Sequence, residues 1–199
     1  HQEGHIRTFA WQSPSKLMYL LDEGVWSSLR EENIDVSEKK VLIQAGGPVM
    51  SNLSLSNNGQ SAAFVGHSPS HPREVFSMRY GEFNPQKLTD HNQWLSEVRL
   101  APQEVVRHLA RDDIELEGVL IRPLNEVQRT RYPLVVVVHG GPESHIRNGW
   151  ISSYSSLGQT LAAKDIAVFF PNYRGSTGRG LEFSKLSQGD PAGKEFDDI

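Results

Sequence analysis

Residues 131–142 read RYPLVVVVHGGP, and this segment contains the strongest structural signal in the chain. The five residues from Leu134 to Val138 are all apolar, and four of them are β-branched valines. Such a run predicts a strand buried on both faces, as in a parallel sheet that is covered by helices. Gly140 and Gly141 follow directly, and they allow a sharp turn that leaves a backbone N–H uncovered by side chains. We therefore expect a parallel sheet with a glycine loop at its carboxyl edge.

Composition limits the classes of protein to consider. The chain has 199 residues, of which 37% are hydrophobic and 22% charged, as in ordinary globular proteins. Its apolar runs are much shorter than the roughly 20 residues of a bilayer helix, so no membrane partner is expected. The net charge is −4 and no block of Lys or Arg stands out, so no nucleic-acid partner is expected. The absence of cysteine excludes disulfides and a cysteine nucleophile, and it leaves the cellular compartment open.

The first half of the chain contains short strands and tight turns. A strand–turn–strand unit begins near residue 8, and a second begins 44 positions later, near residue 52. Asn58-Gly59 in the second unit is typical of a hairpin turn. Each unit is followed by a further predicted strand pair: 26–35 with 40–44, and 74–79 with 86–89. Four strands that repeat at this period are typical of β-propeller blades, and a single β-sandwich is the alternative.

Two blades bury their faces only against further blades, which we expect upstream of His1. Ile199 lies in an expected helix, so we interpret the chain as a piece of a longer protein. His67 and His71 are not expected to bind a metal, because Pro69 prevents the helix that would align them.

The second half contains the pattern of an α/β unit. Residues 105–110 and 114–122 are predicted strands, and the buried strand 134–138 follows them. Apolar residues at 150, 154, 157 and 161 predict an amphipathic helix that ends near residue 164. Another apolar strand is expected at 166–170, so the chain makes a right-handed crossover between parallel strands. The glycine-rich segment 172–180 then lies at the same sheet edge as Gly141, and helices are expected from about 181 and 192.

Three segments, 132–142, 172–180 and 193–199, together resemble the prolyl oligopeptidase family of serine peptidases. The resemblance is greatest to its acylaminoacyl-peptidase and dipeptidyl-peptidase-like members. It implies the last blades of a β-propeller at 1–93, a linker at 94–103, and the N-terminal part of an α/β-hydrolase domain with a mostly parallel sheet at 104–199. The chain departs from the family at Asp112-Asp113, where Asp-Gly is usual, and at 13–16, which lacks the usual blade-turn glycine.

The resemblance implies hydrolysis of short peptides through an acyl-enzyme. This chemistry needs a Ser-Asp-His triad and donors for the oxyanion, with the serine in a Gly-x-Ser-x-Gly turn. No serine in the chain has glycine at both −2 and +2, so the triad is expected beyond Ile199 and this piece is expected to be inactive. By resemblance, the Gly141 N–H is one oxyanion donor, and the plain alternative is a glycine that only allows a tight loop.

Other residues near the loop have weaker assignments. The His139 ring either supports the oxyanion or only braces the loop by hydrogen bonding. Tyr173, Arg174 and Glu143 are predicted to contact substrate, and His145 and Arg147 follow the loop closely enough to do the same. The plain alternative for Tyr173 and Arg174 is an anchoring role, with Glu182 or Asp197 as partner. No metal or organic cofactor is expected, the expected partner is a peptide substrate, and a homo-oligomer is left open.

Two other functions are compatible with the sequence. A carboxylesterase shares the glycine loop, although esterases rarely carry a propeller before the catalytic domain. A propeller scaffold whose hydrolase domain lacks the triad would not be an enzyme. A phosphate-binding loop at 175–180 is set aside, because it lacks both the Gly-Lys-Ser/Thr ending and the Gly-x-Gly-x-x-Gly spacing.

Overall fold

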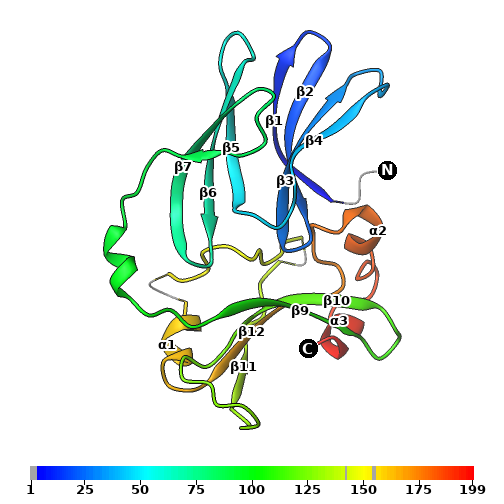
Figure 1. The fold of residues 1–199 in the computed structure, drawn as a ribbon. Helices are drawn as coiled ribbons and strands as arrows, with labels where there is room; N and C mark the ends of the chain where they lie inside the picture. The colour runs from blue at the N-terminus through cyan, green and yellow to red at the C-terminus, as the bar shows by residue number, and fades with distance from the viewer. Residues whose placement is uncertain (1–3, 142, 154–155) are drawn as a thin grey trace.

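The structure is a computed structural model that describes residues 4–141, 143–153 and 156–199. These residues form three four-stranded sheets. Two of them lie side by side at one end of the molecule and the third lies at the other end (Figure 1). No helix among the described residues is long and apolar enough to cross a membrane.

The first two sheets are antiparallel meanders in which consecutive strands pair. The first contains β1 (His5–Ser13), β2 (Lys16–Glu23), β3 (Trp26–Asn33) and β4 (Lys39–Ile43). The second contains β5 (Val49–Leu55), β6 (Ser61–Ser68), β7 (His71–Arg79) and β8 (Gln86–Lys87). The predicted strand pairs are confirmed as β3–β4 and β7–β8, although β8 is shorter than expected. Two successive meanders of this kind are consistent with propeller blades, and we call them the first and second blade sheets.

The hairpin at Asn58-Gly59 shows how the two blade sheets fit together. Gly59 has a φ of +67°, whereas Asn58 does not adopt positive φ, so only the glycine uses its conformational freedom. A Cβ atom at Gly59 would lie 2.6 Å from the backbone oxygen of Gln12 in the first blade sheet. Glycine is therefore needed for the turn and also for the close approach of the neighbouring sheet.

A shared apolar core lies between the blade sheets. The inner faces contribute Met18, Leu20, Leu29, Leu42 and Ile43 from the first sheet and Met50, Ala62, Phe64, Phe76 and Met78 from the second. The Phe64 and Phe76 rings stack with their centroids 5.8 Å apart. The other face of the first sheet is also apolar, with Ile6, Phe9, Leu17 and Tyr19 around an open groove of about 400 Å³. The first sheet thus has two apolar faces, as expected when a blade stands between neighbours.

The third sheet has the order β11-β12-β10-β9. Its strands are β9 (Gln103–Leu109), β10 (Glu115–Ile121), β11 (Leu134–Val136) and β12 (Ala167–Asn172). Only β11 and β12 pair in parallel, while β10 is antiparallel to both β12 and β9. The prediction of a mostly parallel sheet is therefore wrong for the described residues. The short turn between β9 and β10 permits only antiparallel pairing of these two strands, because a parallel pair needs a long crossover. The strand β12 also lies antiparallel to β10, so one of the three strand pairs is parallel.

The strand β11 differs from its prediction in length and in burial. It spans three residues instead of five, and Leu134 and Val136 are 56% and 36% exposed. Burial on both faces is therefore not found for β11, which is the edge strand of the described sheet. Val137, directly after the strand, packs on a second apolar core that includes Val119, Val168 and Phe170.

The predicted helix over 150–164 is mostly absent. The structure has only α1 (Gly158–Ala162), and Tyr154 lies outside the described residues. The first residue of the predicted helix, Trp150, is not helical, and its backbone N–H donates to His67 Nδ1 of the second blade sheet over 2.7 Å. Asn148, just before it, donates to the Val25 oxygen in the β2–β3 turn over 2.7 Å. The helices α2 (Gly180–Ser184) and α3 (Lys194–Asp197) lie close to their predicted starts, and the short 3₁₀ helix η1 (Gln93–Glu97) lies in the predicted linker.

Candidate active site at the glycine loop

Two loops meet at the carboxyl edge of the third sheet. Because β11 and β12 are parallel neighbours, residues 139–141 and residues 173–180 leave the sheet side by side. The Tyr173 hydroxyl donates a hydrogen bond to the His139 backbone oxygen over 3.0 Å, and the two rings stack with centroids 4.5 Å apart. Ser176 also contacts His139, with 3.0 Å between Oγ and Nε2. The two loops are thus joined through the backbone and the ring of His139.

Gly141 has the conformation that the sequence anticipates. Its φ is +58°, and a Cβ atom there would meet nothing within 4 Å. Glycine is therefore favoured by backbone conformation and not by lack of space. Gly141 is exposed, and no described atom accepts a hydrogen bond from its N–H. Glu143 is also exposed, and Pro142 between them lies outside the described residues.

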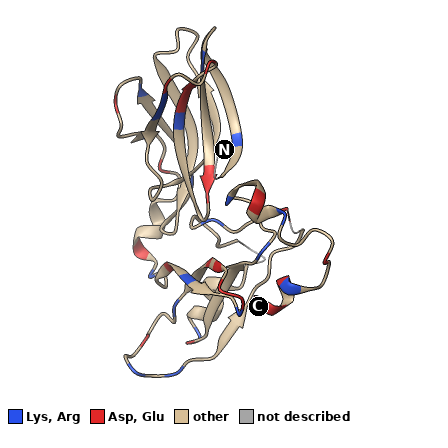
Figure 2. Cartoon of the chain, turned by 90° about the vertical axis from the view of Figure 1, so that its right-hand side faces the viewer, with Lys and Arg blue, Asp and Glu red and all other residues tan. Residues whose placement is uncertain are grey.

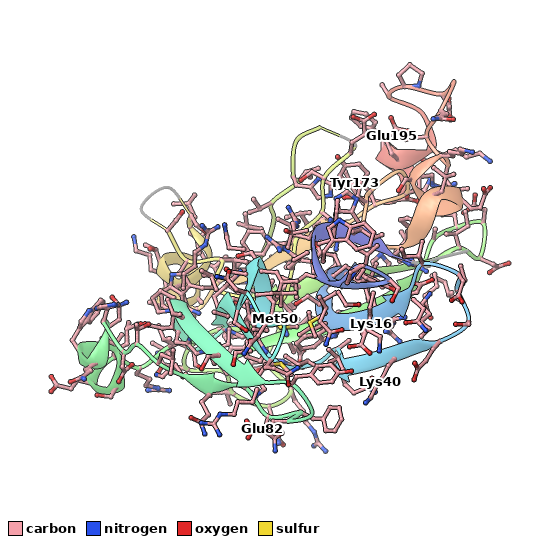
Figure 3. All side chains as sticks on the ribbon, turned by 90° about the horizontal axis from the view of Figure 1, so that it is seen from above. Lys16, Lys40, Met50, Glu82, Tyr173 and Glu195 are labelled. Carbon is pink, nitrogen blue, oxygen red and sulfur yellow. The ribbon has the colours of Figure 1, made fainter. Side chains whose placement is uncertain are left out.

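Tyr173 is buried and His139 is half-buried. Burial lowers the pKa of His139, so its ring is neutral near pH 7. Burial, together with the nearby charge of Glu195, raises the pKa of Tyr173, which keeps its proton for the bond to His139. Figure 3 shows Tyr173 and Glu195 on the same side of the molecule, away from the labelled residues of the blade sheets. These contacts favour a bracing role for both side chains.

Arg174 is only 3% exposed and is held by two carboxylates. Its Nε and Nη2 bond to Asp198, and its Nη1 and Nη2 bond to Asp112, at distances between 2.6 and 2.9 Å. The hydrogen bonds from Arg174 lower the pKa of Asp112 to about 2. These bonds favour the anchoring alternative for Arg174. The expected partners were wrong, because Asp197 pairs with Arg111 and Glu182 lies near Lys185.

The departure at Asp112-Asp113 has a local explanation. Asp113 has a φ of +63°, which glycine adopts freely and aspartate tolerates better than most residues. The preceding Asp112 supplies one of the carboxylates that hold Arg174. The turn between β9 and β10 therefore contributes directly to the edge that carries the glycine loop.

The segment after the glycine loop is tied to the first blade sheet through Asp22. This aspartate on β2 is fully buried and forms an ion pair with Arg7 over 2.8 Å. His145 Nε2 and Arg147 Nη1 lie 3.4 and 3.7 Å from its carboxylate oxygens. Burial opposes ionisation of Asp22, but His145, Arg147 and Arg7 outweigh it and hold the pKa below the usual value.

These contacts give His145 and Arg147 a different role from the predicted one. Both were predicted to contact substrate, but the structure places them against a blade carboxylate. The Nδ1 atom of His145 lies 2.8 Å from the Thr177 hydroxyl, which connects it to the second loop as well. Sequence reasoning missed Asp22, and the only available signal was a charged residue at the end of the apolar run Leu17–Leu21.

The second blade sheet holds the same segment through His67. The Trp150 N–H donates to His67 Nδ1 over 2.7 Å. Burial, aided by the charges of Arg147 and Arg73, lowers the pKa of His67 to about 4. Residues 145–150 are thus fixed by a side chain from each blade sheet.

A large cleft lies beside this junction. It has a volume of about 760 Å³ and lies between the β2–β3 turn, the start of β10 and residues 178–182. Acidic and basic residues both line it, among them Glu117, Arg107 and Arg179. Basic and acidic positions are also interspersed over the whole chain (Figure 2). Gly141 does not line the cleft, so the cleft and the glycine loop are separate features of the same region.

Comparisons with known proteins agree with this architecture. The chain superimposes on an acylaminoacyl peptidase from Pyrococcus horikoshii with a TM-score of 0.80 and 20% identity, over 99% of this chain and 30% of that one. The chain therefore shares its fold with about a third of the length of that peptidase. Residues 152–199 match the prolyl oligopeptidase family. The family resemblance drawn from the sequence is thus confirmed.

Two relatives illustrate the similarity in sequence. The chain is 33% identical to the uncharacterised peptidase YuxL of Bacillus subtilis over 150 residues, which is 75% of this chain and 22% of the relative. It is 34% identical to the acylamino-acid-releasing enzyme of Sus scrofa over 83 residues, 42% of this chain and 11% of that enzyme. The chain therefore spans about a fifth or less of the length of these relatives.

Two carboxylates hold Arg174, and we expect loss of the buried one, Asp198, to have a large effect on stability. We expect Asp198→Asn in the intact protein to lower the free energy of unfolding by about 3–5 kcal/mol, because it leaves a buried guanidinium short of a counter-charge. The matched variant is Asp112→Asn, which should cost clearly less because this side chain is 39% exposed and water replaces the lost bonds. Denaturant unfolding measures both, and equal losses would contradict the argument.

The environment of His67 predicts a dependence of stability on pH. Its pKa of about 4 lies below the unfolded value of 6.5, so the unfolded state binds the proton first as the pH falls. We expect stability to fall between pH 6.5 and 4, by at most about 1.4 kcal/mol per pH unit from this group. In His67→Asn the amide oxygen can still accept the Trp150 N–H but does not titrate, so the decline should be shallower. His71→Asn is the control, and curves of equal slope for His67→Asn and the unaltered protein would refute the assignment.

Proposed function

We propose that the intact protein is a serine peptidase of the prolyl oligopeptidase family that hydrolyses short peptides through an acyl-enzyme. In this proposal residues 1–93 are propeller blades, 94–103 form a linker, and 104–199 begin an α/β-hydrolase domain. The crossover from β11 to β12 supports the hydrolase assignment, because it places a glycine loop at the edge where such domains build the oxyanion hole. The confirmed family resemblance supports the reaction class.

The observation that carries the proposal is the Gly141 N–H. It is exposed, it lacks an acceptor among the described atoms, and its loop is held by Tyr173 and Ser176 through His139. A donor fixed before the reaction stabilises a developing oxyanion without reorganisation, and loss of one such donor typically lowers turnover about 10²–10³-fold. We assign Tyr173 and Arg174 to anchoring the loops, while the exposed Glu143 stays a candidate for contact with substrate.

The relatives suggest which substrates to test. One of them is an acylamino-acid-releasing enzyme and another is a dipeptidyl aminopeptidase, from Pseudoxanthomonas mexicana, that is 36% identical over 106 residues. We therefore propose release of acylated amino acids or dipeptides from short peptides. A carboxylesterase is less well supported, because the blade sheets pack on the segment that follows the glycine loop.

The test uses the intact protein and three chromogenic substrates: an acylaminoacyl anilide, a dipeptidyl anilide and a short-chain ester. Hydrolysis of either anilide, blocked by a serine-directed phosphonate, is the expected result. Turnover of the ester alone would overturn the peptidase proposal in favour of an esterase. The absence of all three activities would favour the non-catalytic scaffold.

The oxyanion assignment is tested at Gly141. We expect Gly141→Val to lower kcat about 10²–10³-fold, because valine does not hold the positive φ that orients the N–H. The matched control is Gly81→Val: Gly81 has a φ of +90° and open space around it, but it lies in the turn between β7 and β8 of the second blade sheet. Both variants should lose similar stability, and only Gly141→Val should lose turnover. A folded Gly141→Val enzyme with unchanged kcat would refute the assignment.

A further inference from the structure

Ser176 is a fully buried residue in the loop after β12, and its hydroxyl has two partners. The oxygen lies 2.6 Å from the Tyr173 backbone oxygen and 3.0 Å from His139 Nε2. A backbone oxygen can only accept, so the hydroxyl proton points to Tyr173. The Ser176 oxygen is then an acceptor toward His139.

This arrangement decides where His139 carries its proton. Because the Ser176 proton is used by Tyr173, the bond to His139 forms only if Nε2 is protonated and donates. The ring is neutral at pH 7, since burial lowers its pKa, so Nδ1 is left without a proton. A neutral ring has one N–H, so only one of its two contacts can be a hydrogen bond to an acceptor. The 3.0 Å contact of Nε2 with Ser176 is the shorter one and keeps the proton, whereas Nδ1 is left at 3.4 Å from the Gly140 backbone oxygen.

The Gly140 oxygen belongs to the same peptide unit as the Gly141 N–H. In a trans peptide the two groups point in opposite directions, so a rotation of one re-aims the other. A protonated Nδ1 would donate to the Gly140 oxygen and draw it closer than the observed 3.4 Å, which would turn this unit, whereas a bare Nδ1 does not donate to it. When the proton is on Nε2, the ring does not donate to the Gly140 oxygen, so only the backbone conformation sets the orientation of the Gly141 N–H.

We propose that Ser176 is a positioning residue that fixes the Nε2–H tautomer of His139 and thereby keeps the Gly141 N–H aimed at the oxyanion. The proposal rests on the peptidase function proposed above and deepens it. Tyr173 has a separate task in the same unit: its hydroxyl fixes the His139 backbone oxygen and does not touch the ring nitrogens.

The tautomer is measured directly by ¹⁵N NMR of histidine-labelled intact protein, with the His139 signals assigned from their loss in His139→Asn. We expect protonated Nε2 in the unaltered protein and in Tyr173→Phe, and a shift toward protonated Nδ1 in Ser176→Ala. Ser184→Ala is the matched control, because the Ser184 hydroxyl bonds to backbone oxygens in the same loop but not to His139. It should leave the tautomer unchanged.

Kinetics on the anilide substrates give the second measurement. We expect Ser176→Ala to lower kcat about 10- to 100-fold with little change in KM, because the donor is misplaced in the transition state while ground-state binding is kept. Ser184→Ala should retain kcat. Protonated Nδ1 in the unaltered protein, or an unchanged tautomer in folded Ser176→Ala, would overturn the inference.

The two proposals fail in different ways. Absence of hydrolysis by the unaltered protein overturns the peptidase function, whatever the NMR result. Normal hydrolysis with an unaltered tautomer or unaltered kcat in Ser176→Ala overturns only the role of Ser176. If Ser176→Ala does not fold, the tautomer of the unaltered protein and of Tyr173→Phe still decides, because both must have protonated Nε2.

Discussion

The parallel pairing of β11 with β12 is the constraint on which the site depends. Parallel neighbours end at the same edge of a sheet, so loops separated by more than 30 residues in sequence leave the third sheet together. This pairing permits the Tyr173 and Ser176 bonds to His139, and these bonds in turn fix the backbone before Gly141. An antiparallel pair would send the two loops to opposite edges, and none of these contacts could form.

The blade sheets add a second layer of constraint. A loop that is fixed only at its start would still be free to move after Gly141, but residues 145–150 contact Asp22 of one blade sheet and bond to His67 of the other. Buried charges are costly unless they are paired, so the carboxylate of Asp22 favours only arrangements that bring cationic or donor groups next to it. The blade sheets therefore restrict the conformation of the segment that follows the proposed oxyanion donor.

Local signals in the sequence predicted the positions of most strands. They did not predict that most strands of the third sheet pair antiparallel, or that β11 is partly exposed. Alternating residues and turn residues predicted the hairpins of both blade sheets, and the glycine pair predicted the backbone of Gly141. The apolar stripe from Trp150 to Leu161 fitted a helix, but the backbone of its first residue, Trp150, bonds to His67 of the second blade sheet, a long-range contact without a local signal. The partners of Arg174 lie 62 and 24 residues away, so no spacing rule pointed to Asp112 or Asp198.

The charges around the glycine loop bear on how it would act. Arg174 is a buried cation on the second loop, and two carboxylates neutralise it. The His139 ring is neutral near pH 7, and its one N–H is used by Ser176. Neither side chain is then free to compensate a negative charge at the loop, so in the proposed mechanism that task falls to backbone N–H groups. A backbone donor has no charge to be screened or titrated, and its strength depends on orientation. This dependence gives a reason for the bonds that Tyr173 and Ser176 make to His139, the residue that connects the donor to the sheet.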